Sequence, residues 1–377
     1  MRILIAPLDW GLGHATRCIP IIKYLLEKSC EVVIGADGRA LHLLQKEFPA
    51  CEFVKISGYD ISYPKNGSMV LKMASQIPKI ISGIKREHKL LKKIIKERKI
   101  DAVISDNRYG LWSREVPSVF ITHQLIIKSP FGEKLIHKLN MKYISKYSEC
   151  WIPDYAGDNN LSGDLSHKFS LPKNVKFIGV LSRFASPPAP LPLERGAQYK
   201  LLVILSGPEP QRTLFEKKII EQLDSPPTPL PVRQAGLQKE RGVLIVQGIT
   251  EKSVLIKISE NIEMISYLTA EELKKEICSS EIVLCRPGYS SVMDLAMLNK
   301  KVIFVPTPGQ TEQEYLAKYF SDKKIAYSVS QKYFDLKVAI KESEKYSGFT
   351  GNYSGEEFKN VVDKFLLSLG RRSNFSK

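Results

Sequence analysis

A short stretch near the start of the chain combines residue types that bind anions and move protons. LDWGLGHATR (8–17) follows an apolar run and holds Gly11, Gly13, His14 and Arg17. Glycines let the backbone approach a ligand, and a helix that starts after them offers unpaired N–H groups to an anion. The third glycine of a dinucleotide fingerprint is missing, because residue 16 is threonine. His14 is therefore a candidate general base or phosphate contact, and a polar residue at a helix start is the alternative.

Polar residues also follow two later apolar runs of the first half. Asp106, Asn107 and Arg108 come after the run that begins at residue 101, and His123 ends the run 118–123. Ligands of open α/β sheets bind at the carboxyl ends of strands, where these residues would lie. Capping and turn roles are the alternative. We predict catalytic roles for His14 and Asp106, and acceptor contacts for Gly11, Gly13, Arg17, Asn107, Arg108 and His123.

The second half has its own candidates at the ends of apolar runs. In SGPEPQRT (206–213), Ser206, Gly207 and Arg212 are suited to holding a phosphate, although the GK[ST] of a Walker loop is absent. The longer stretch CRPGYSSVMDLAMLNKKVIFVPTPGQTEQEYLAKYF (285–320) places small residues, a carboxylate and an acidic cluster at two further helix starts. Its candidates are Gly288, Ser290, Ser291, Asp294, Gln313 and Glu314. Asp294 is placed to bond a ribose diol, or else complements the helix dipole.

These residues are positioned by a regular alternation of apolar strand-like runs and helical segments. Such alternation with nearly all-apolar strands predicts parallel sheets covered on both faces, here two doubly wound α/β domains. The expected strands are 2–7, 31–36, 52–56, 101–106, 118–123, 174–180, 200–207, 242–248, 261–268, 281–288 and 301–307. The expected helices are 15–28, 39–48, 69–99, 211–224, 269–280, 290–299 and 310–323.

Two related proline-rich segments interrupt this alternation of strands and helices. SPPAPLPLERGAQ (186–198) and SPPTPLPVRQAGLQKERG (225–242) read as copies of one inserted element. Proline excludes both from central strands and helices, so we expect surface loops away from the working site. The predicted organisation is an N-terminal domain, a proline-rich linker, a C-terminal domain containing the second insert, and a terminal helix with a tail, at 1–181, 182–198, 199–355 and 356–377.

Composition limits the class of protein and of partner. The chain has 377 residues, 43% of them hydrophobic and 25% charged, as in ordinary globular proteins. No apolar run reaches the roughly 18–20 residues that span a bilayer, so we expect a cytoplasmic protein. The six cysteines have no CxxC spacing, which favours buried thiols over disulfides or a zinc site. A net charge of +16 favours anionic partners.

Part of this charge lies in the segment 79–99, KIISGIKREHKLLKKIIKERK. Ile84, Leu91 and Ile95 recur at helical spacing, and residues 85–99 hold eight Lys or Arg and two Glu. A basic amphipathic helix of this kind can lie on an anionic membrane. Alternatively, its apolar stripe packs on the sheet and its basic face is only solvated. The first alternative predicts peripheral attachment at the inner face of the membrane, which would suit a lipid-linked acceptor.

Taken together, the glycine-histidine turn and RPGYSSVMDLAMLNKKVIFVPTPGQTEQEYLA resemble the GT-B glycosyltransferases. The chain is most similar to glycosyltransferase family 28, which includes the UDP-N-acetylglucosamine transferase of peptidoglycan lipid assembly. The resemblance implies two Rossmann-like domains facing a central cleft, with the donor bound by the C-terminal domain and the acceptor by the N-terminal domain. It implies transfer of a hexose-type sugar from a nucleotide donor, UDP in the first instance, to an acceptor hydroxyl with inversion. The acceptor would be a sugar or a lipid-linked sugar.

The resemblance also assigns the donor contacts. The uracil would lie against the backbone near Ser266, Tyr267 and Leu268, and the ribose on Asp294, where the family more often has Glu. The diphosphate would face Gly288, Ser290 and Ser291, with Ser206, Gly207 and Arg212 opposite. The sugar hydroxyls would face Gln313 and Glu314, a Gln-Glu pair in place of the family's Gln-Gln, so the sugar need not be N-acetylglucosamine.

Other functions would require different residues in the sequence. A UDP-sugar 2-epimerase of the same fold should bring more carboxylates and histidines to the donor sugar. A nucleic-acid-binding protein should interleave aromatic residues with its basic patch, and 79–99 contains none. A sugar-nucleotide-binding protein without turnover would lack an acceptor base. No DxD motif occurs, so we expect no metal and no other cofactor, with helix N-termini and arginines stabilising the leaving diphosphate.

Overall fold

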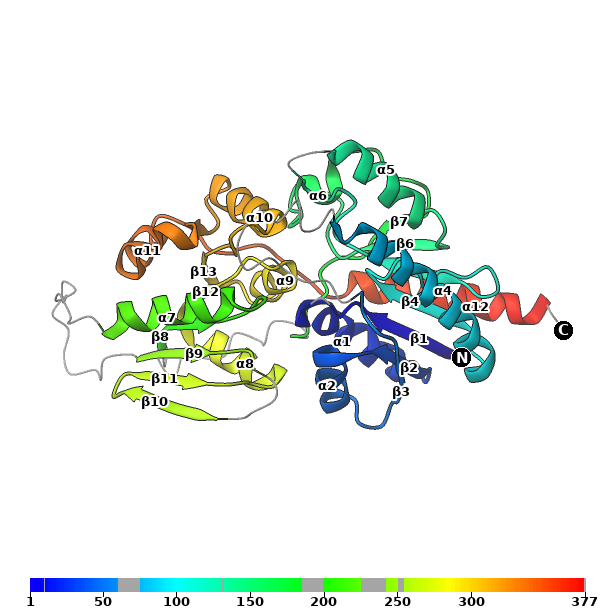
Figure 1. The fold of residues 1–377 in the computed structure, drawn as a ribbon, viewed down its shortest axis with the longest axis horizontal. Coiled ribbons are helices and arrows are strands. Elements are labelled where there is room, and N and C mark those ends of the chain that lie inside the picture. Colours follow the sequence, from blue (N-terminus) through cyan, green and yellow to red (C-terminus); the bar gives the residue numbers. More distant parts are fainter. Residues whose placement is uncertain are drawn as a thin grey trace. The chain divides into compact units, whose positions relative to one another are not determined.

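The computed structural model describes residues 1–9, 11–59, 75–129, 132–184, 199–224, 242–249 and 254–375. The proline-rich segment 186–198 lies outside these residues, and so does the second segment except for Gly242. Residue contacts divide the chain into two units. The first comprises residues 1–186, 289–297 and 352–377, and the second comprises 187–288 and 298–351. Each unit is built on one seven-stranded sheet, which confirms the predicted pair of doubly wound α/β domains (Figure 1).

The sheet of the first unit is entirely parallel, in the order β3-β2-β1-β4-β5-β6-β7. Its strands are β1 (Arg2–Pro7), β2 (Glu31–Ala36), β3 (Glu52–Lys55), β4 (Ala102–Asp106), β5 (Ser118–Ile121), β6 (Glu149–Ile152) and β7 (Val175–Phe177). The helices grouped with it are α1 (Leu12–Glu27), α2 (Gly38–Glu47), α4 (Ile77–Arg98), α5 (Glu133–Ile144), α6 (Asp164–His167), α9 (Tyr289–Met297) and α12 (Glu357–Phe375).

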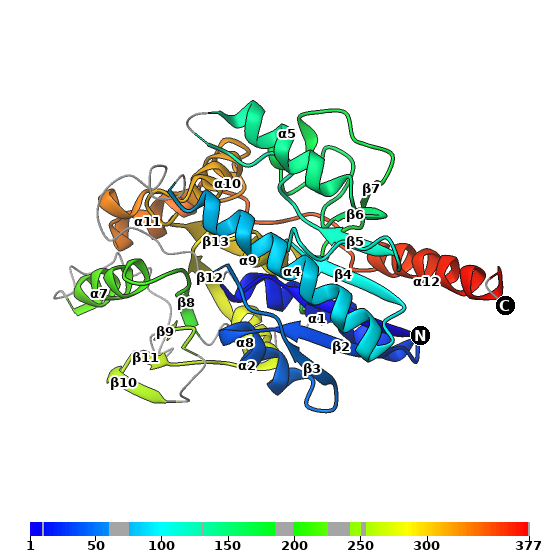
Figure 2. The same cartoon turned by 45° about the vertical axis from the view of Figure 1, so that its right-hand side comes forward.

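Alternate residues of these strands face opposite layers of helices. On one face, α4 buries Leu91, Ile94 and Ile95 against Leu4 and Val33, among other strand residues. Figures 1 and 2 both show α4 running across the sheet. On the opposite face, Trp151 of β6 packs edge-on against Phe365 of α12, and Tyr24 of α1 packs in the same way against Phe358.

The packing of α4 decides between the two interpretations of the basic helix. Its predicted apolar stripe, Ile84, Leu91 and Ile95, is buried in the core at 8%, 0% and 6% exposure. The stripe is therefore not available to a membrane, because the sheet already covers it. The lysines and arginines of α4 lie on the exposed face, and Ile77 and Ile81 are its exposed large apolar residues.

Gly110 marks the closest approach of the β4 turn to α4. A Cβ on this buried glycine would lie 2.4 Å from the backbone oxygen of Ile84 and 2.6 Å from Cβ of Glu87. We expect Gly110→Ala to lower the free energy of unfolding by about 1–3 kcal/mol, because the backbone of α4 must shift to admit the methyl group. Urea denaturation measures this change. The matched control is Gly157→Ala, where nothing lies within 4 Å of the new Cβ. Equal stability changes in the two variants would contradict the packing described.

The sheet of the second unit has the order β10-β11-β9-β8-β12-β13-β14. Every pairing is parallel except that of the edge strand β10 with β11. Its strands are β8 (Tyr199–Ile204), β9 (Gly242–Val246), β10 (Leu255–Ser259), β11 (Ile262–Ile265), β12 (Ser280–Cys285), β13 (Lys301–Phe304) and β14 (Tyr327–Ser328). Its helices are α7 (Gln211–Asp224), α8 (Ala270–Cys278), α10 (Thr311–Asp322), the 3-10 turn η1 (Gln331–Tyr333) and α11 (Leu336–Ser343).

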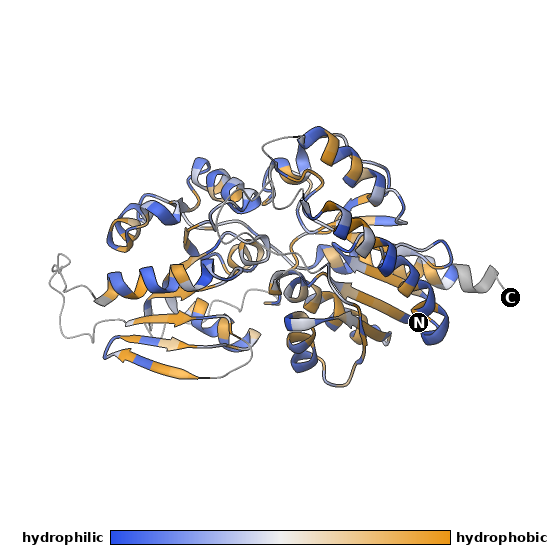
Figure 3. Cartoon of the chain, viewed as in Figure 1, coloured by the Kyte–Doolittle hydropathy of each residue, from blue (hydrophilic) through white to orange (hydrophobic). Residues whose placement is uncertain are grey.

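The core of this unit lies on both faces of the sheet, whose strands are mostly apolar (Figure 3). Phe215 of α7 and Leu336 of α11 pack on one face. Phe304 of β13 points to the other face and contacts Phe320 of α10. The helix α8 begins with a capping box, in which Thr269 and Glu272 satisfy each other's backbone N–H groups. The edge strand β10 is mostly exposed.

Candidate functional site

Three turns of the first sheet bring the predicted catalytic residues together. The strands β1, β4 and β5 are neighbours and parallel, so their carboxyl ends meet at one edge. The chain leaves β1 through Gly11, whose φ of 84° is a glycine conformation, and enters α1 with His14 in its first turn. Asp106 is the last residue of β4, and His123 lies two residues after β5. This edge therefore collects residues that lie more than 100 positions apart in the sequence.

The carboxylate of Asp106 is the centre of this cluster. Nδ1 of His14 lies 2.8 Å from Oδ1 of Asp106. Arg17 donates from Nε to Oδ2 of Asp106 at 2.5 Å and from Nη2 to Oδ1. Nη1 of Arg17 lies 2.9 Å from Nδ1 of His123. The structure thus joins His14, Arg17, Asp106 and His123 in one hydrogen-bonded group.

Nδ1 of His14 lies between two partners of opposite kind. Oδ1 of Asp106, 2.8 Å away, can only accept, and Nη2 of Arg17, 2.9 Å away, can only donate, so these contacts are compatible with either tautomer. In the tautomer with its proton on Nδ1, His14 donates to Asp106, and Nε2 is the basic nitrogen of the neutral imidazole. Nδ1 of His123 faces Nη1 of Arg17, and its Nε2 lies 3.4 Å from the amide nitrogen of Gln124. Within the part of the chain that the structure describes, Nε2 of His14 makes no hydrogen bond, and the His14 side chain is 14% exposed.

The charges beside Asp106 keep its carboxylate ionised despite its burial. Burial alone would raise the pKa of Asp106, but the Arg17 charge and then His14 outweigh it and hold this pKa well below its usual range. Asp106 is 0% exposed and Arg17 is 2% exposed, so the ion pair is shielded from water. Cys18 donates to Oδ2 of the same carboxylate at 3.6 Å, and burial followed by Asp106 raises the pKa of its thiol. A buried aspartate paired with a partly exposed histidine is an arrangement that can act as a general base.

The helix α9 adds two contacts to this cluster. The hydroxyl of Ser290 donates to the backbone oxygen of Gly13 at 2.7 Å. The ring of Tyr289 stacks in parallel on His123, with centroids 4.1 Å apart, and its hydroxyl donates to the backbone oxygen of Pro153. Sequence reasoning did not select Tyr289 or Cys18. An aromatic residue and a cysteine in apolar segments carry no signal that separates them from core residues.

Arg108 does not join the cluster, contrary to its predicted acceptor contact. It is 0% exposed, and its guanidinium donates to the backbone oxygens of Pro7, Ile56 and Ser57 and to the carboxylate of Glu87. An acceptor cannot reach donors that are buried and already used, so Arg108 is a structural residue that ties β1 and β4 to α4. Its neighbour Asn107 has a φ of 56° and only partial burial, which leaves its predicted role open.

The phosphate residues predicted after β8 have different surroundings. Ser206 is exposed, and Gly207 has a φ of 106°, with Oγ1 of Thr307 3.5 Å from the position of an added Cβ. Arg212 forms ion pairs with Glu209 and Glu216 at 2.6 and 2.8 Å. Two carboxylates thus neutralise the guanidinium predicted to face the diphosphate. A phosphate would have to compete with both for the same donors.

The segment predicted to face the uracil follows β11. Ser266 is 5% exposed, and both its backbone groups are used: its N–H donates to Val254 and its oxygen accepts from Ile249. Its hydroxyl also contacts Val254. Tyr267 and Leu268 are only partly buried. Of the three residues, Ser266 is therefore committed to the fold, and Tyr267 and Leu268 keep the predicted base contact open.

Asp294 is held within the first unit. Its carboxylate accepts from the hydroxyl of Ser182 at 2.7 Å and from Nε of Arg183 at 3.0 Å, and it is 4% exposed. Burial raises the pKa of Asp294, while Arg183 and the Ser182 hydroxyl act in the opposite direction. A ribose could reach this carboxylate only if these donors moved. Gly288 and Ser291, at the start of the same helix, are partly exposed.

The polar pair of α10 supports the loop that precedes the helix. Oε1 of Gln313 accepts from the N–H of Thr307 at 2.8 Å, and Oε1 of Glu314 accepts from the N–H of Gly309 at 2.9 Å. Both side chains thus stabilise the carboxyl end of β13. Each keeps its other polar atom for a further partner, which leaves the predicted sugar contacts open.

Sequence reasoning missed Arg286, whose side chain organises the edge of the second sheet. Its guanidinium donates to the backbone oxygens of Val305, Pro306 and Gln211 and to Oε1 of Gln331. It also lies 4.3 Å from the Phe215 ring, and burial lowers the pKa of Arg286 to about 10. Its position directly before the glycine-serine turn is a signal that the sequence did contain.

Comparison with known proteins shows which families this chain resembles. Residues 233–350 match the model of the glycosyltransferase family 28 C-terminal domain, and residues 1–137 match that of glycosyl transferase family 1. The crystal structure of MurG from Acinetobacter baumannii superposes with a TM-score of 0.56 at 16% identity, over 96% of this chain and 98% of that one. The chain is a GT-B-fold relative of the family 28 glycosyltransferases. Its predicted resemblance to them is confirmed.

Similar proteins from several organisms align with most of the chain. An uncharacterized glycosyltransferase of Methanosarcina acetivorans is 25% identical over 333 residues, which cover 83% of this chain and 82% of the relative. The UDP-N-acetylglucosamine--N-acetylmuramyl-(pentapeptide) pyrophosphoryl-undecaprenol N-acetylglucosamine transferase of Histophilus somni is 23% identical over 93% of this chain and 89% of its own. The glycosyltransferase SnogD from Streptomyces nogalater shares the fold, with a TM-score of 0.58 at 11% identity over 97% of this chain and 99% of that one.

Three further observations bear on this GT-B relative. All six of its cysteines are free thiols. Among the described residues, no group of three or more His, Cys, Asp or Glu side chains is placed to hold a metal ion. In the same part of the chain, no helix combines the length and the apolar character that crossing a membrane requires.

Proposed function

We propose that this GT-B relative transfers a hexose-type sugar from a UDP-sugar to an acceptor hydroxyl with inversion. Both matching family models are glycosyltransferase models, which favours this function over the 2-epimerase alternative. The observation that carries the proposal is the His14–Asp106 pair at the carboxyl edge of the first sheet. It gives a glycosyltransferase fold a base for the acceptor hydroxyl.

In the proposed reaction, Nε2 of His14 accepts the proton of the acceptor hydroxyl as the oxygen attacks C1 of the donor sugar. The bond from C1 to the diphosphate oxygen breaks, and UDP leaves with the electron pair. Asp106 holds Nδ1–H of His14 and stabilises the imidazolium that forms. Arg17 neutralises Asp106, so that the carboxylate is oriented without being protonated. Attack from the face opposite the leaving group inverts the configuration at C1.

We further propose that the donor is bound without a metal ion. The diphosphate is proposed to lie at the start of α9, where Gly288 and Ser291 are partly exposed and the N–H groups of a helix start stabilise an anion. The sugar contacts proposed for Gln313 and Glu314 rest on the polar atoms that these side chains keep free of the loop. A sugar or lipid-linked acceptor and attachment to an anionic membrane surface belong to the same proposal.

A thermal-unfolding panel of UDP-, GDP- and TDP-sugars, run in EDTA, tests the donor class. A ligand at 100 times its dissociation constant stabilises the folded protein by about 2.7 kcal/mol, so UDP-sugars should raise the melting temperature by several degrees. GDP- and TDP-sugars serve as matched controls with the same diphosphate. A larger shift with GDP or TDP would contradict the UDP assignment. A UDP shift that appears only after Mg²⁺ is added would contradict the metal-independent donor site.

A further inference from the structure

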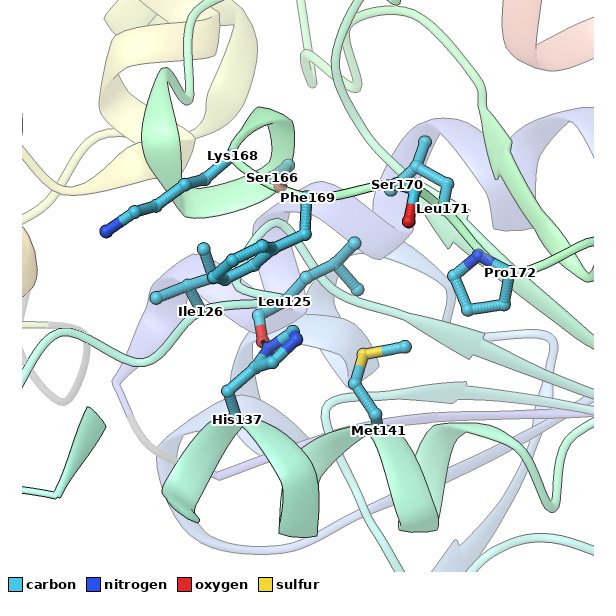
Figure 4. Close-up of a pocket in the computed structure, with 10 residues that line it drawn as sticks. All are labelled: Leu125, Ile126, His137, Met141, Ser166, Lys168, Phe169, Ser170, Leu171 and Pro172. Atoms are coloured by element: carbon cyan, nitrogen blue, oxygen red, sulfur yellow. Dashed lines mark hydrogen bonds between the residues drawn. The ribbon is translucent and has the colours of Figure 1, made fainter. Parts of the chain in front are cut away.

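The first unit contains a cavity of about 210 Å³, and one of its lining residues, Ser166, donates to the backbone oxygen of His123 (Figure 4). The cavity lies between α5 and the segment that follows α6, and its wall is mainly apolar. Met141 of α5 and Phe169 of the opposite segment point into it, with Leu125 between them. The other apolar lining residues are Ile126, Leu171 and Pro172. An apolar cavity of about 150 Å³ accommodates a benzene molecule, so this one has room for a segment of aliphatic chain.

The mouth of the cavity has large apolar side chains on its surface. Phe169 and Leu171, which line the cavity, are 47% and 37% exposed. On helix α5, Leu135 and Leu139 are also exposed, at 64% and 50%, but at 3.6 residues per turn they lie on the side of the helix opposite His137 and Met141, which line the cavity. Phe169 and Leu171 are therefore the exposed apolar residues of the mouth itself.

Basic residues border the same surface. The segments 133–144 and 168–173 together contain five lysines and one glutamate. Lys134, Lys138 and Lys142 are exposed on α5. Lys168, at the cavity, lies 3.5 Å from the one glutamate, Glu133. The remaining positive charge favours an anionic group beside the apolar mouth.

One wall of the cavity is fixed by a pair of rings. The imidazole of His137 stacks on Phe169 with centroids 4.8 Å apart, and its Nδ1 lies 2.9 Å from the backbone oxygen of Leu125, to which it donates. Phe169 is thereby held in place although it is half exposed.

We propose that this cavity binds the aliphatic chain of an anionic membrane lipid, with the lipid head group beside the lysines of α5 and the segment 168–173. The apolar cavity and its apolar mouth suit the aliphatic chain, and the basic border suits the anionic head group. The surface differs from α4, whose apolar stripe is buried in the core. The proposal rests on the membrane attachment included in the proposed function, and it does not depend on the glycosyl-transfer reaction.

Calorimetric titration of the whole protein with dodecyl phosphate, below the critical micelle concentration of this phosphate, tests whether the cavity binds an aliphatic chain. Saturable binding of one molecule is expected. Butyl phosphate has the same head group and should bind at least about 100-fold more weakly, because each buried methylene strengthens binding about fourfold. Equal affinities for the two phosphates, or no saturable binding of dodecyl phosphate, would overturn the proposal.

Two variants place the site in this cavity. Leu171→Asp puts a charge at an exposed mouth position, and Met141→Trp fills the interior. Both should weaken dodecyl phosphate binding at least about tenfold, as expected when a chain loses about 1.4 kcal/mol or more of contact. Leu214→Asp is the matched control, since it makes the same charge change at a 49% exposed leucine of the second unit. Wild-type affinity in either cavity variant, with its thermal unfolding unchanged, would overturn the assignment.

Vesicle flotation tests whether the aliphatic chain that occupies the cavity belongs to a membrane lipid. Wild-type protein and Leu214→Asp should float with phosphatidylglycerol vesicles and not with phosphatidylcholine vesicles. Leu171→Asp should remain largely unbound. Flotation of Leu171→Asp equal to that of wild type would contradict a membrane lipid as the occupant.

Discussion

Replacing His14 with alanine is expected to lower kcat for sugar transfer by about 10²–10⁴-fold, the usual contribution of a positioned general base. Donor affinity should not change, because His14 belongs to the acceptor side of the proposed reaction. His14 is partly exposed and bonds through Nδ1 alone, so the variant should fold normally. Steady-state kinetics and calorimetric donor titration on the same samples measure the two effects.

The alternative role of His14, as a phosphate contact, gives a different result. If Nε2 only held a phosphate, donor binding and turnover would fall together in His14→Ala. His14→Gln provides the control, because its amide can donate a hydrogen bond but cannot accept a proton at neutral pH. Near-normal turnover in His14→Gln would exclude the base role.

Replacing Asp106 with asparagine is expected to lower the free energy of unfolding at pH 7 by about 3–5 kcal/mol. The change leaves the Arg17 charge, only 2% exposed, without its counter-charge. It should also lower kcat about 10³-fold or more, because an amide can hold His14 in the wrong tautomer. Urea denaturation measures the first effect. Asp164→Asn is the matched control: it breaks an exposed ion pair with Lys128 and should cost at most about 1 kcal/mol.

The stability difference between wild type and Asp106→Asn should depend on pH in one direction. The folded-state pKa of Asp106 lies below its unfolded value, so its contribution is complete above an unfolded pKa of about 4. That contribution is lost as pH falls through the lower folded value. The difference between the two proteins should therefore shrink as pH falls below about 4. A difference that keeps its full size between about pH 4 and pH 2 would contradict an ionised Asp106 in the folded protein.

Much of the fold follows from local sequence patterns. Continuous apolar runs such as Arg2–Pro7 and Ala102–Asp106 mark central strands, since both of their faces are buried. The predicted run 261–268 is a strand only at Ile262–Ile265, because the chain then bends into the capped helix α8. The edge strand β10 was not predicted. Its residues are mostly exposed, so burial leaves no clear pattern in its sequence.

The candidate site was predictable in part. Gly11, His14 and Asp106 stand at strand ends, and the parallel topology alone brings strand ends together. The sequence could not distinguish Arg17, which binds Asp106, from Arg108, which is buried by Glu87 and three backbone oxygens. Both are arginines after a strand, and only the packing of α4 separates them. The Ser182 and Arg183 contacts of Asp294 were equally hidden, because they join residues more than 110 positions apart.

Hydrolysis of a UDP-sugar in the absence of any acceptor tests the central claim most directly. Water then takes the place of the acceptor hydroxyl, gives its proton to His14 and attacks C1 as UDP leaves. Proton NMR of the anomeric region should show the β-sugar first when an α-linked UDP-sugar is supplied to the wild-type protein, and no release above background with His14→Ala. First release of the α-anomer, or equal release by both proteins, would contradict inverting transfer with His14 as the base.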